Sequence, residues 1–319
     1  MGILDGKVAI VTGAGHGVGR GHALDLAAAG ARVVVNDLGG SPSGGGADSA
    51  PAEAVAAIIR ERGGEAVANV DDVSDFDGAR NLVRQAVDQF GGLDVLVNNA
   101  GILRDRMIFN MGEDDWDAVV KVHLKGHFAP SRFACEYWRN RAKEIDGPVH
   151  ASVVCTSSLV GLEGNIGQTN YAAAKGGIAM FTIALALEME RYGVRANCVA
   201  PSGTTRLITM TQGTDAAPLE PDQYTAWDAR DPGNVAPLVT WLASDLSRHV
   251  TGQVFLSIGP SITHYRPWTP NVTVTVPGGD RKWAPEEIGV ALDTLAFGTR
   301  HPGLRRGSEF QGPGTSPFG

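Results

Sequence analysis

The sequence has little that could stabilise the fold other than its own core. It contains only three cysteines in 319 residues, and they lie far apart, at Cys135, Cys155 and Cys198. Their number is odd and no CxxC or histidine spacing accompanies them, so neither a disulfide framework nor a metal site is predicted. Unpaired thiols are typical of reducing compartments, and a cytoplasmic location is therefore expected.

An excess of basic residues is also absent. Lys and Arg number 27 against 35 Asp and Glu, which gives a formal net charge of −8. This balance disfavours a nucleic acid or a charged membrane surface as a partner. The segment Met1–Gly6 lacks the basic and apolar regions of a signal peptide, and the apolar helical stretch Ile178–Leu187 is too short to cross a bilayer. A soluble protein with a small-molecule substrate is the expectation.

Short apolar runs rich in β-branched residues alternate with stretches of helical periodicity. The predicted strands are Lys7–Thr12, Arg32–Asn36, Glu65–Val70, Leu93–Val97, Val149–Thr156, Val194–Val199 and Gln253–Ile258. The predicted helices are Val18–Ala29, Pro51–Arg62, Asp77–Phe90, Glu113–Arg141, Tyr171–Tyr192 and Asn234–Ser244. This alternation predicts an α/β fold in which helices cover both faces of a parallel sheet, a single Rossmann-type doubly wound domain over residues 1–260.

Three segments depart from the alternation. Leu38–Ser49 is rich in glycine and is either a plain linker or a functional loop, whereas Ser202–Arg230 is long and polar and is expected to cover the substrate. Residues 261–319 hold 7 of the 17 prolines and are predicted to form an extension that is partly disordered or packed near the substrate cleft. Within it, Val272–Val276 is a candidate strand and Pro285–Leu295 a candidate helix.

Much of the unusually high glycine content, 42 residues, falls in turns such as the one after the first predicted strand. Thr12–Gly19 fits the pattern GxxxGxG and opens the first predicted helix, where backbone N–H groups can bind a pyrophosphate. Asp37 ends the second predicted strand, and a carboxylate there accepts hydrogen bonds from a ribose and repels a 2′-phosphate. NAD is therefore favoured over NADP, although His16 is a basic residue in the turn and points the other way.

A second group of residues suggests proton transfer. Tyr171 and Lys175 are four residues apart at the start of a predicted helix, so the phenol and the ammonium share one face. A nearby cation is expected to lower the pKa of the phenol. Ser158 follows the fifth predicted strand, at the edge of the sheet where ligands bind, and its hydroxyl is placed to bind a substrate carbonyl.

These motifs together resemble the short-chain dehydrogenases/reductases over residues 6–260. The resemblance implies a strand order of 3-2-1-4-5-6-7, with Tyr171 as general acid/base, Lys175 as its partner and a ligand of the cofactor ribose, and Ser158 as the group that orients the substrate. Contacts to the cofactor are implied for Gly13, Gly15, His16, Gly17, Val18, Gly19, Asp37, Asp72, Val73, Asn99, Ala100, Gly101, Tyr171, Lys175, Pro201, Gly203 and Thr204.

The sequence departs from the family pattern at two positions. His123 stands where most members have an asparagine that supports a proton-relay water, so His123 is either a relay residue or a structural histidine. Pro201-Ser202-Gly203 replaces the usual Pro-Gly, which leaves the contact to the nicotinamide amide open.

A closer similarity narrows the substrate. The segments 34–40, 99–106 and 122–128 resemble the (3R)-hydroxyacyl-CoA dehydrogenase part of peroxisomal multifunctional enzyme type 2 and actinobacterial relatives, some of which act on steroid side-chain thioesters. The resemblance implies an NAD-dependent enzyme that interconverts a 3-hydroxyacyl-CoA and its 3-oxoacyl-CoA. A hydroxysteroid dehydrogenase, a 3-oxoacyl-carrier-protein reductase and a catalytically idle nucleotide sensor are the alternatives. Family analogy also implies a homodimer or homotetramer.

Overall fold

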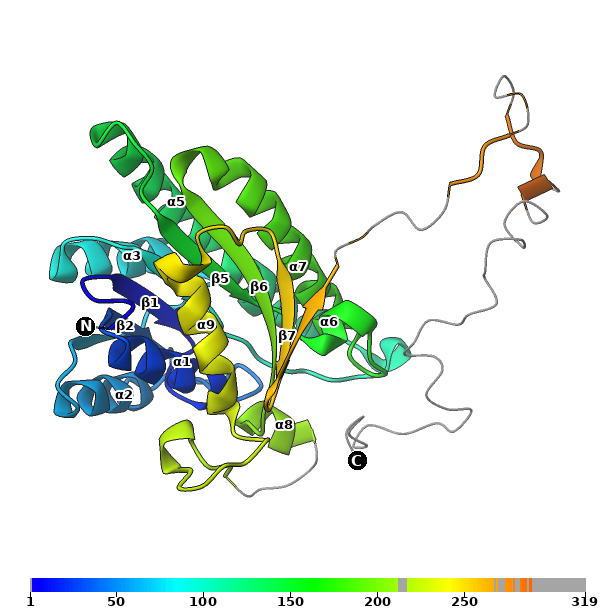
Figure 1. The fold of residues 1–319 in the computed structure, drawn as a ribbon. Helices are drawn as coiled ribbons and strands as arrows, with labels where there is room; N and C mark the ends of the chain where they lie inside the picture. The colour runs from blue at the N-terminus through cyan, green and yellow to red at the C-terminus, as the bar shows by residue number, and fades with distance from the viewer. Residues whose placement is uncertain are drawn as a thin grey trace.

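The computed structural model describes residues 2–211 and 217–266, together with residues 268, 273–276, 278, 282–285, 287 and 288. Its centre is an eight-stranded sheet in the order β3-β2-β1-β4-β5-β6-β7-β8 (Figure 1). The strands are β1 (Val8–Thr12), β2 (Arg32–Asn36), β3 (Ala66–Asn69), β4 (Val95–Asn98), β5 (Ala151–Thr156), β6 (Val194–Ser202), β7 (Val254–Ile258) and β8 (Ser261–Tyr265). Seven strands are parallel, and β8 pairs antiparallel with β7.

Helices cover both faces of the sheet. The helices are α1 (Gly17–Ala28), α2 (Ala50–Glu61), α3 (Phe76–Phe90), α4 (Glu113–Val120), α5 (Gly126–Glu144), α6 (Leu159–Glu163), α7 (Thr169–Met189), α8 (Arg206–Thr211) and α9 (Ala236–Ala243). On one face α1, α2 and α9 pack over a core that includes Leu26, Val33 and Leu242. On the other, α3, α5 and α7 pack over a core that includes Leu82, Trp138 and Ile178.

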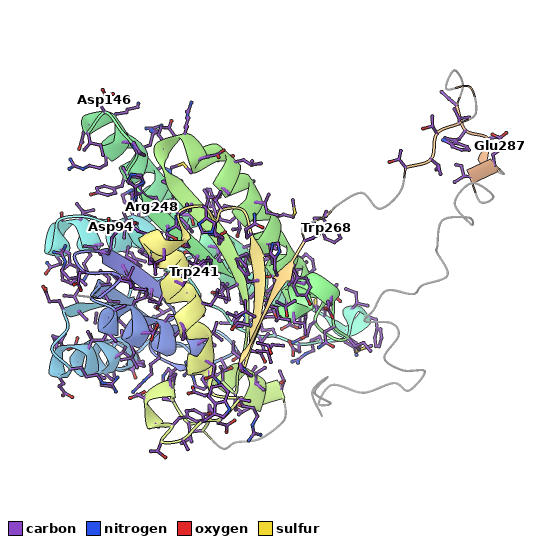
Figure 2. All side chains as sticks on the ribbon, viewed as in Figure 1. Asp94, Asp146, Trp241, Arg248, Trp268 and Glu287 are labelled. Carbon is purple, nitrogen blue, oxygen red and sulfur yellow. The ribbon has the colours of Figure 1, made fainter. Side chains whose placement is uncertain are left out.

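The central strands are apolar along their whole length because both of their faces are covered. All five residues of β1 and all six of β5 are buried. At the amino ends, the side chain of Asp94 (labelled in Figure 2) accepts a hydrogen bond from the Val8 N–H at 2.8 Å and so joins β1 to β4. The carboxyl ends of the parallel strands all meet at the opposite edge, where the candidate site lies.

The predicted α/β class and the strand order 3-2-1-4-5-6-7 are confirmed. The antiparallel strand β8 was not predicted, and it starts the extension that follows residue 260. Its last residue, Tyr265, donates a hydrogen bond to Glu163 of α6 at 2.6 Å. The candidate strand Val272–Val276 is wrong for residues 273–276, which have no regular structure, and most of the candidate helix Pro285–Leu295 lies outside the described residues.

Two further predictions are refined. The helix expected over Glu113–Arg141 is divided by a π-helical turn, Lys121–Lys125. The loop Leu38–Ser49 is more than a linker: its carbonyl groups accept hydrogen bonds from the Leu103 N–H at 3.0 Å and from the Arg104 guanidinium at 3.0 Å. The loop thereby supports the chain that follows β4.

The predicted helix Tyr171–Tyr192 is observed as α7, which begins two residues earlier and is followed by the short turn Glu190–Tyr192. With the turn that follows it, Thr169–Tyr192 is long and apolar enough to cross a membrane by length and composition alone, which corrects the expectation drawn from Ile178–Leu187. A core helix of a globular domain passes the same test. Ile178 and Ala186 belong to the buried core beside β5 and β6.

Candidate active site

The glycine turn between β1 and α1 is built by close backbone approaches. A Cβ atom on Gly19 would lie 2.1 Å from the carbonyl oxygen of Gly13, so only glycine fits there. Asp37 follows β2, is nearly buried, and accepts hydrogen bonds from the N–H groups of Gly15 and Gly39, both at 2.7 Å. The predicted phosphate turn and the predicted ribose carboxylate are therefore neighbours.

The end of β4 holds the same turn from the other side. Asn99 donates from its side-chain amide to the carbonyls of Thr12 at 3.0 Å and Gly13 at 3.1 Å. The N–H groups of Asn99 and Ala100 donate to the Thr12 hydroxyl, at 2.9 Å and 3.1 Å. A cofactor bound at the turn would thus lie on a backbone fixed by β1 and β4 together.

The residues expected beside the adenine follow β3. The Asp72 carboxylate accepts hydrogen bonds from the N–H and hydroxyl groups of Ser74, at 2.8 Å and 2.6 Å, and lies 3.8 Å from the Lys121 ammonium. Val73 is buried in the core. The backbone here is fixed, and it lies on the same edge of the sheet as Asp37 because β3 pairs with β2.

The structure brings Ser158, Tyr171 and Lys175 together. The Ser158 hydroxyl is close enough to the Tyr171 phenol to lower its pKa, and it caps α6 by accepting a hydrogen bond from the Val160 N–H at 3.2 Å. The Lys175 Nζ atom lies 5.7 Å from the centre of the Tyr171 ring and donates to the carbonyl of Thr156, the last residue of β5, at 2.6 Å. These three side chains form the arrangement that the sequence predicted.

Burial changes the proton affinities of this group. Burial, with a smaller contribution from the charge of Asp105, raises the pKa of Tyr171 to about 12 although Ser158 lowers it. Burial lowers the pKa of Lys175 to about 7. The pKa of Tyr171 therefore lies above its ordinary value, opposite to the lowering by Lys175 that the sequence suggested, because burial is the largest influence on it.

His123 is fully buried beside these residues, in the π-helical turn. Its ring packs edge-on against Tyr171, with the ring centres 5.1 Å apart. The Nε2 atom lies 2.7 Å from the carbonyl oxygen of Ile102 and 3.1 Å from the Ile102 N–H; because the shorter contact is to an oxygen that can only accept, we assign the ring proton to Nε2. Among the residues that the structure describes, none hydrogen-bonds Nδ1. Burial, together with the charge of Lys175, holds the pKa of His123 well below its usual range, so the ring is neutral.

Gly101 is required by this histidine. A Cβ atom at position 101 would lie 2.3 Å from Cε1 of His123, although the backbone there tolerates any residue. The glycine that the family resemblance places beside the cofactor thus also makes room for the imidazole next to Tyr171.

The residues at the carboxyl end of β6 and just after it border the candidate site. Pro201 lies within β6 and pairs with Ser257, so the departure Pro201-Ser202-Gly203 extends the strand to Ser202. The Thr204 N–H donates to the carbonyl of Arg230 at 2.7 Å, which closes the base of the Ser202–Arg230 loop. Within the described part of this loop, α8 is a helix that the sequence did not indicate.

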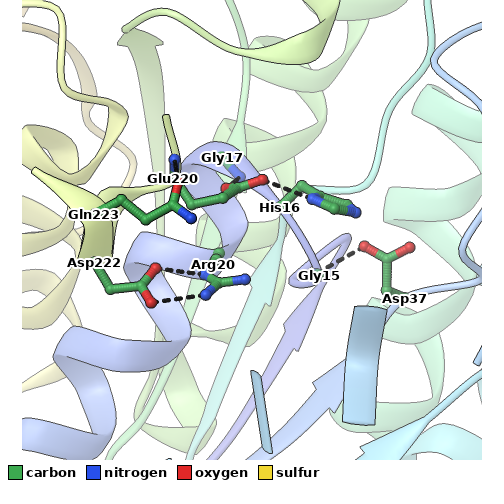
Figure 3. Close-up of polar contacts among 8 residues, drawn as sticks. All are labelled: Gly15, His16, Gly17, Arg20, Asp37, Glu220, Asp222 and Gln223. Atoms are coloured by element: carbon green, nitrogen blue, oxygen red, sulfur yellow. Dashed lines mark hydrogen bonds and ion pairs between the residues drawn. The ribbon is translucent and has the colours of Figure 1, made fainter. Parts of the chain in front are cut away.

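Two features of the site were missed by the sequence reading. Asp105, whose pKa is raised by burial, accepts a hydrogen bond from the Gln168 amide at 2.9 Å. Glu220 and Asp222 reach the first turns of α1 from about 200 residues further along the chain (Figure 3). No local sequence pattern predicts contacts between such distant residues. They could have been predicted only by assuming that the Ser202–Arg230 loop covers the cofactor turn.

We expect Gly101→Ala to destabilise the protein through its clash with His123. Overpacking of a fixed core typically costs about 1–3 kcal/mol. Urea unfolding of the wild type, Gly101→Ala, His123→Ala and the double variant measures the coupling, and the cost of the alanine at 101 should nearly vanish when position 123 is alanine. An equal cost in both backgrounds would contradict this explanation.

We also expect Lys175→Met to stabilise the ligand-free protein. Below about pH 7 the ammonium is charged in both states, so its burial costs free energy in full; the cost fades as the pH rises toward 10.5, the ordinary pKa. The gain should be about 2–4 kcal/mol at pH 7 and clearly smaller at pH 9.5. Chemical unfolding at both values measures it, with the exposed Lys143→Met as control. A gain that does not depend on pH would reflect packing alone.

Comparisons with known proteins agree with this geometry. The family model of the short chain dehydrogenases matches residues 7–217. The chain is 43% identical over 291 residues to the hydroxyacyl-CoA dehydrogenase ChsB1 of Mycobacterium tuberculosis, covering 91% of this chain and 88% of that protein. It is 42% identical over 241 residues to peroxisomal multifunctional enzyme type 2 of Mus musculus, covering 76% of this chain and 30% of the larger enzyme.

A solved structure is similar as well. A short chain dehydrogenase from Mycobacterium avium superimposes with a TM-score of 0.79 at 46% identity, covering 92% of this chain and 96% of that one. Such similarity implies a nicotinamide cofactor. With the glycine turn and the grouped Ser158, Tyr171 and Lys175, it leads to one conclusion: the chain belongs to the short-chain dehydrogenase family and is an oxidoreductase that acts on CH–OH groups.

Proposed function

We propose that the protein is an NAD-dependent dehydrogenase that interconverts 3-hydroxyacyl-CoA and 3-oxoacyl-CoA thioesters. The observation that carries the proposal is the grouping of Tyr171 with Ser158, which influences the pKa of the phenol, and with the buried Lys175, 5.7 Å from the ring, at the sheet edge that also bears the glycine turn. The substrate class is supported by the identity to the hydroxyacyl-CoA dehydrogenase and the multifunctional enzyme.

In the proposed mechanism Tyr171 exchanges a proton with the substrate oxygen. With a pKa of about 12 the Tyr171 phenol keeps its proton at neutral pH and can donate it to a ketone. The phenolate, which can accept a proton from an alcohol, would be favoured by the positive charge of an oxidised nicotinamide. Ser158 donates a hydrogen bond to the same oxygen and orients it. Lys175, fixed by the Thr156 carbonyl, holds a cation beside the ring.

The cofactor would be held by residues that fit it. The N–H groups at the start of α1 would bind the diphosphate, Asp37 the adenosine ribose, and Lys175 the second ribose. When bound, the nicotinamide supplies or accepts the hydride. Asp37 supports NAD over NADP because its carboxylate, held by the Gly15 and Gly39 N–H groups, would face a 2′-phosphate with like charge. The contacts implied for Asp72, Val73, Ala100, Pro201, Gly203 and Thr204 stay predictions.

His123 is proposed to support the proton path. Its Nδ1 atom, which has no hydrogen-bond partner in the part of the chain that the structure describes, is a buried acceptor on a ring that packs against Tyr171. Nδ1 would bind a relay water in place of the asparagine backbone that most family members use. The neutral ring donates through Nε2 to the Ile102 carbonyl and thus also fixes the chain that follows Gly101.

Apolar surface beside the site suits an acyl chain or a steroid nucleus. The segment after β4 and the segment before α7, which leads to Tyr171, pair at the bridge between Arg106 and Gln168. They present Ile108, Phe109 and Ile166, which are exposed by 61%, 76% and 52%. Exposed apolar side chains that form a contiguous patch usually mark binding surfaces.

A homodimer or homotetramer and a cytoplasmic location stay predictions. Phe128 on α5 and Met180 and Leu187 on α7 are exposed apolar side chains, which supports a subunit interface formed by these two helices.

Tyr171→Phe should lower kcat by about 10²–10⁴-fold, because only the proton-transferring hydroxyl is removed. NAD binding, measured by calorimetry, and the melting temperature should stay near the wild-type values. The distant Tyr192→Phe serves as a matched control that keeps full activity. Substantial turnover by the Tyr171 variant would disprove the acid/base role.

The substrate and cofactor are tested by a panel of rates. We expect 3-hydroxyacyl-CoA esters and steroid side-chain CoA thioesters to give the highest kcat/KM, free hydroxysteroids less, and NAD more than NADP with each. Asp37→Ser should narrow the preference for NAD by about tenfold or more, since the repulsion of the 2′-phosphate is removed. Preference for free hydroxysteroids, or for NADP, would contradict the proposal.

A further inference from the structure

An acidic segment of the Ser202–Arg230 loop, which contains Glu220 and Asp222, contacts the phosphate turn (Figure 3). The two carboxylate oxygens of Glu220 lie 2.6 Å from Nδ1 of His16 and 2.7 Å from the N–H of Gly17, the first residue of α1. One carboxylate therefore holds both the basic side chain of the turn and one of the helix N–H groups that have no partner within the helix.

A second contact fixes this docking. Asp222 forms a two-point ion pair with Arg20, with both N–O distances 2.7 Å, and both side chains are little exposed. The short helical turn Pro221–Gln223, which contains Asp222, packs against α1. Burial raises the pKa of Glu220, but the hydrogen bonds from His16 and Gly17 more than offset this and hold the pKa below its ordinary value. The carboxylate at the turn is thus an anion at neutral pH.

The start of a helix attracts anions because its N–H groups and the positive end of its dipole point outward. A diphosphate bound at this turn would use the Gly17 N–H that now donates to Glu220. Two anions so close to one N–H group repel each other. The carboxylate and the diphosphate therefore compete for the turn.

We propose that Glu220 is an internal competitor of the cofactor's diphosphate, which weakens binding of the cofactor and is displaced by it. The inference rests on the proposed function, in that the turn binds a dinucleotide. Displacement frees His16 and the Gly17 N–H for the diphosphate and detaches residues 217–223 from α1. Binding of the cofactor is thereby coupled to the segment that covers the substrate side.

A permanent structural cap makes the opposite predictions. If Glu220 stayed in place when a nucleotide binds, its charge would be part of the finished site and its removal would only destabilise the loop. Removal of the Glu220 charge should strengthen the binding of diphosphate ligands if Glu220 is a competitor, and should not if it is a permanent cap. Adenosine provides the comparison because it lacks a diphosphate.

Calorimetric titration of Glu220→Gln with ADP and with adenosine tests the proposal. We expect ADP to bind about tenfold more tightly than to the wild type, and the affinity for adenosine to stay within twofold. Glu53→Gln, which removes one exposed negative charge from the first turn of α2, should change neither. Unchanged or weaker ADP binding, or an equal gain for adenosine, would overturn the proposal.

Hydrogen exchange of the wild-type protein gives a test that needs no variant. Saturating ADP should increase exchange in peptides that cover residues 217–230, whereas adenosine should not. Protection or no change with ADP would show that the segment stays docked. Neither experiment involves turnover, so failure of the proposed reaction, seen as no NADH from any 3-hydroxyacyl-CoA, is distinguishable from failure of this inference.

Discussion

The Lys175 ammonium is buried against the last carbonyl of β5, and the placement of the reacting groups depends on that contact. The hydrogen bond to Thr156, 2.6 Å long, fixes the first turns of α7 to the carboxyl edge of the sheet. A second bond, from the Ser157 hydroxyl to the Lys175 carbonyl at 2.8 Å, holds the same helix from its backbone. Tyr171, one turn earlier on α7, is thereby positioned over Ser158.

This arrangement has an energetic cost that the rest of the fold must offset. Burial lowers the pKa of Lys175 and raises that of Tyr171, so each group is less easily ionised than in water. The same burial lowers the pKa of His123, whose Nδ1 atom has no hydrogen-bond partner among the described residues. Buried polar groups that are only partly satisfied are typical of functional sites, where stability is given up for reactivity.

The sequence predicted the parts of the fold that local patterns encode. Runs such as Val8–Thr12 and Ala151–Thr156 are apolar throughout because both faces are covered, and their strand type could be read directly. Ser158, Tyr171 and Lys175 could be grouped because parallel strands end at one edge and because positions 171 and 175 share a helix face.

The remaining features depend on contacts between distant residues. The π-helical turn at His123 is stabilised by the Ile102 backbone and the space at Gly101, neither of which is local to it. The strand β8 exists because the chain reverses after β7 and finds a free edge, and its sequence, Ser261–Tyr265, is not strongly apolar. The pKa of Tyr171 could not be inferred from its spacing to Lys175, because the spacing carries no information on burial.

The net negative charge of the protein matters at the cofactor turn, where several carboxylates lie near the expected position of an anionic ligand. A protein with a net charge of −8 that binds anionic ligands must keep its own carboxylates from repelling them. Here each nearby acid has its own donors: Asp37 has two backbone N–H groups, and Asp222 has Arg20. Glu220 differs because both of its donors, His16 and the Gly17 N–H, belong to the phosphate turn, whereas Asp37 takes one donor from the turn, the Gly15 N–H, and the other from Gly39. Under the proposed competition Asp37 therefore remains in place when a dinucleotide binds, whereas Glu220, whose partners the ligand also requires, leaves the turn together with its segment.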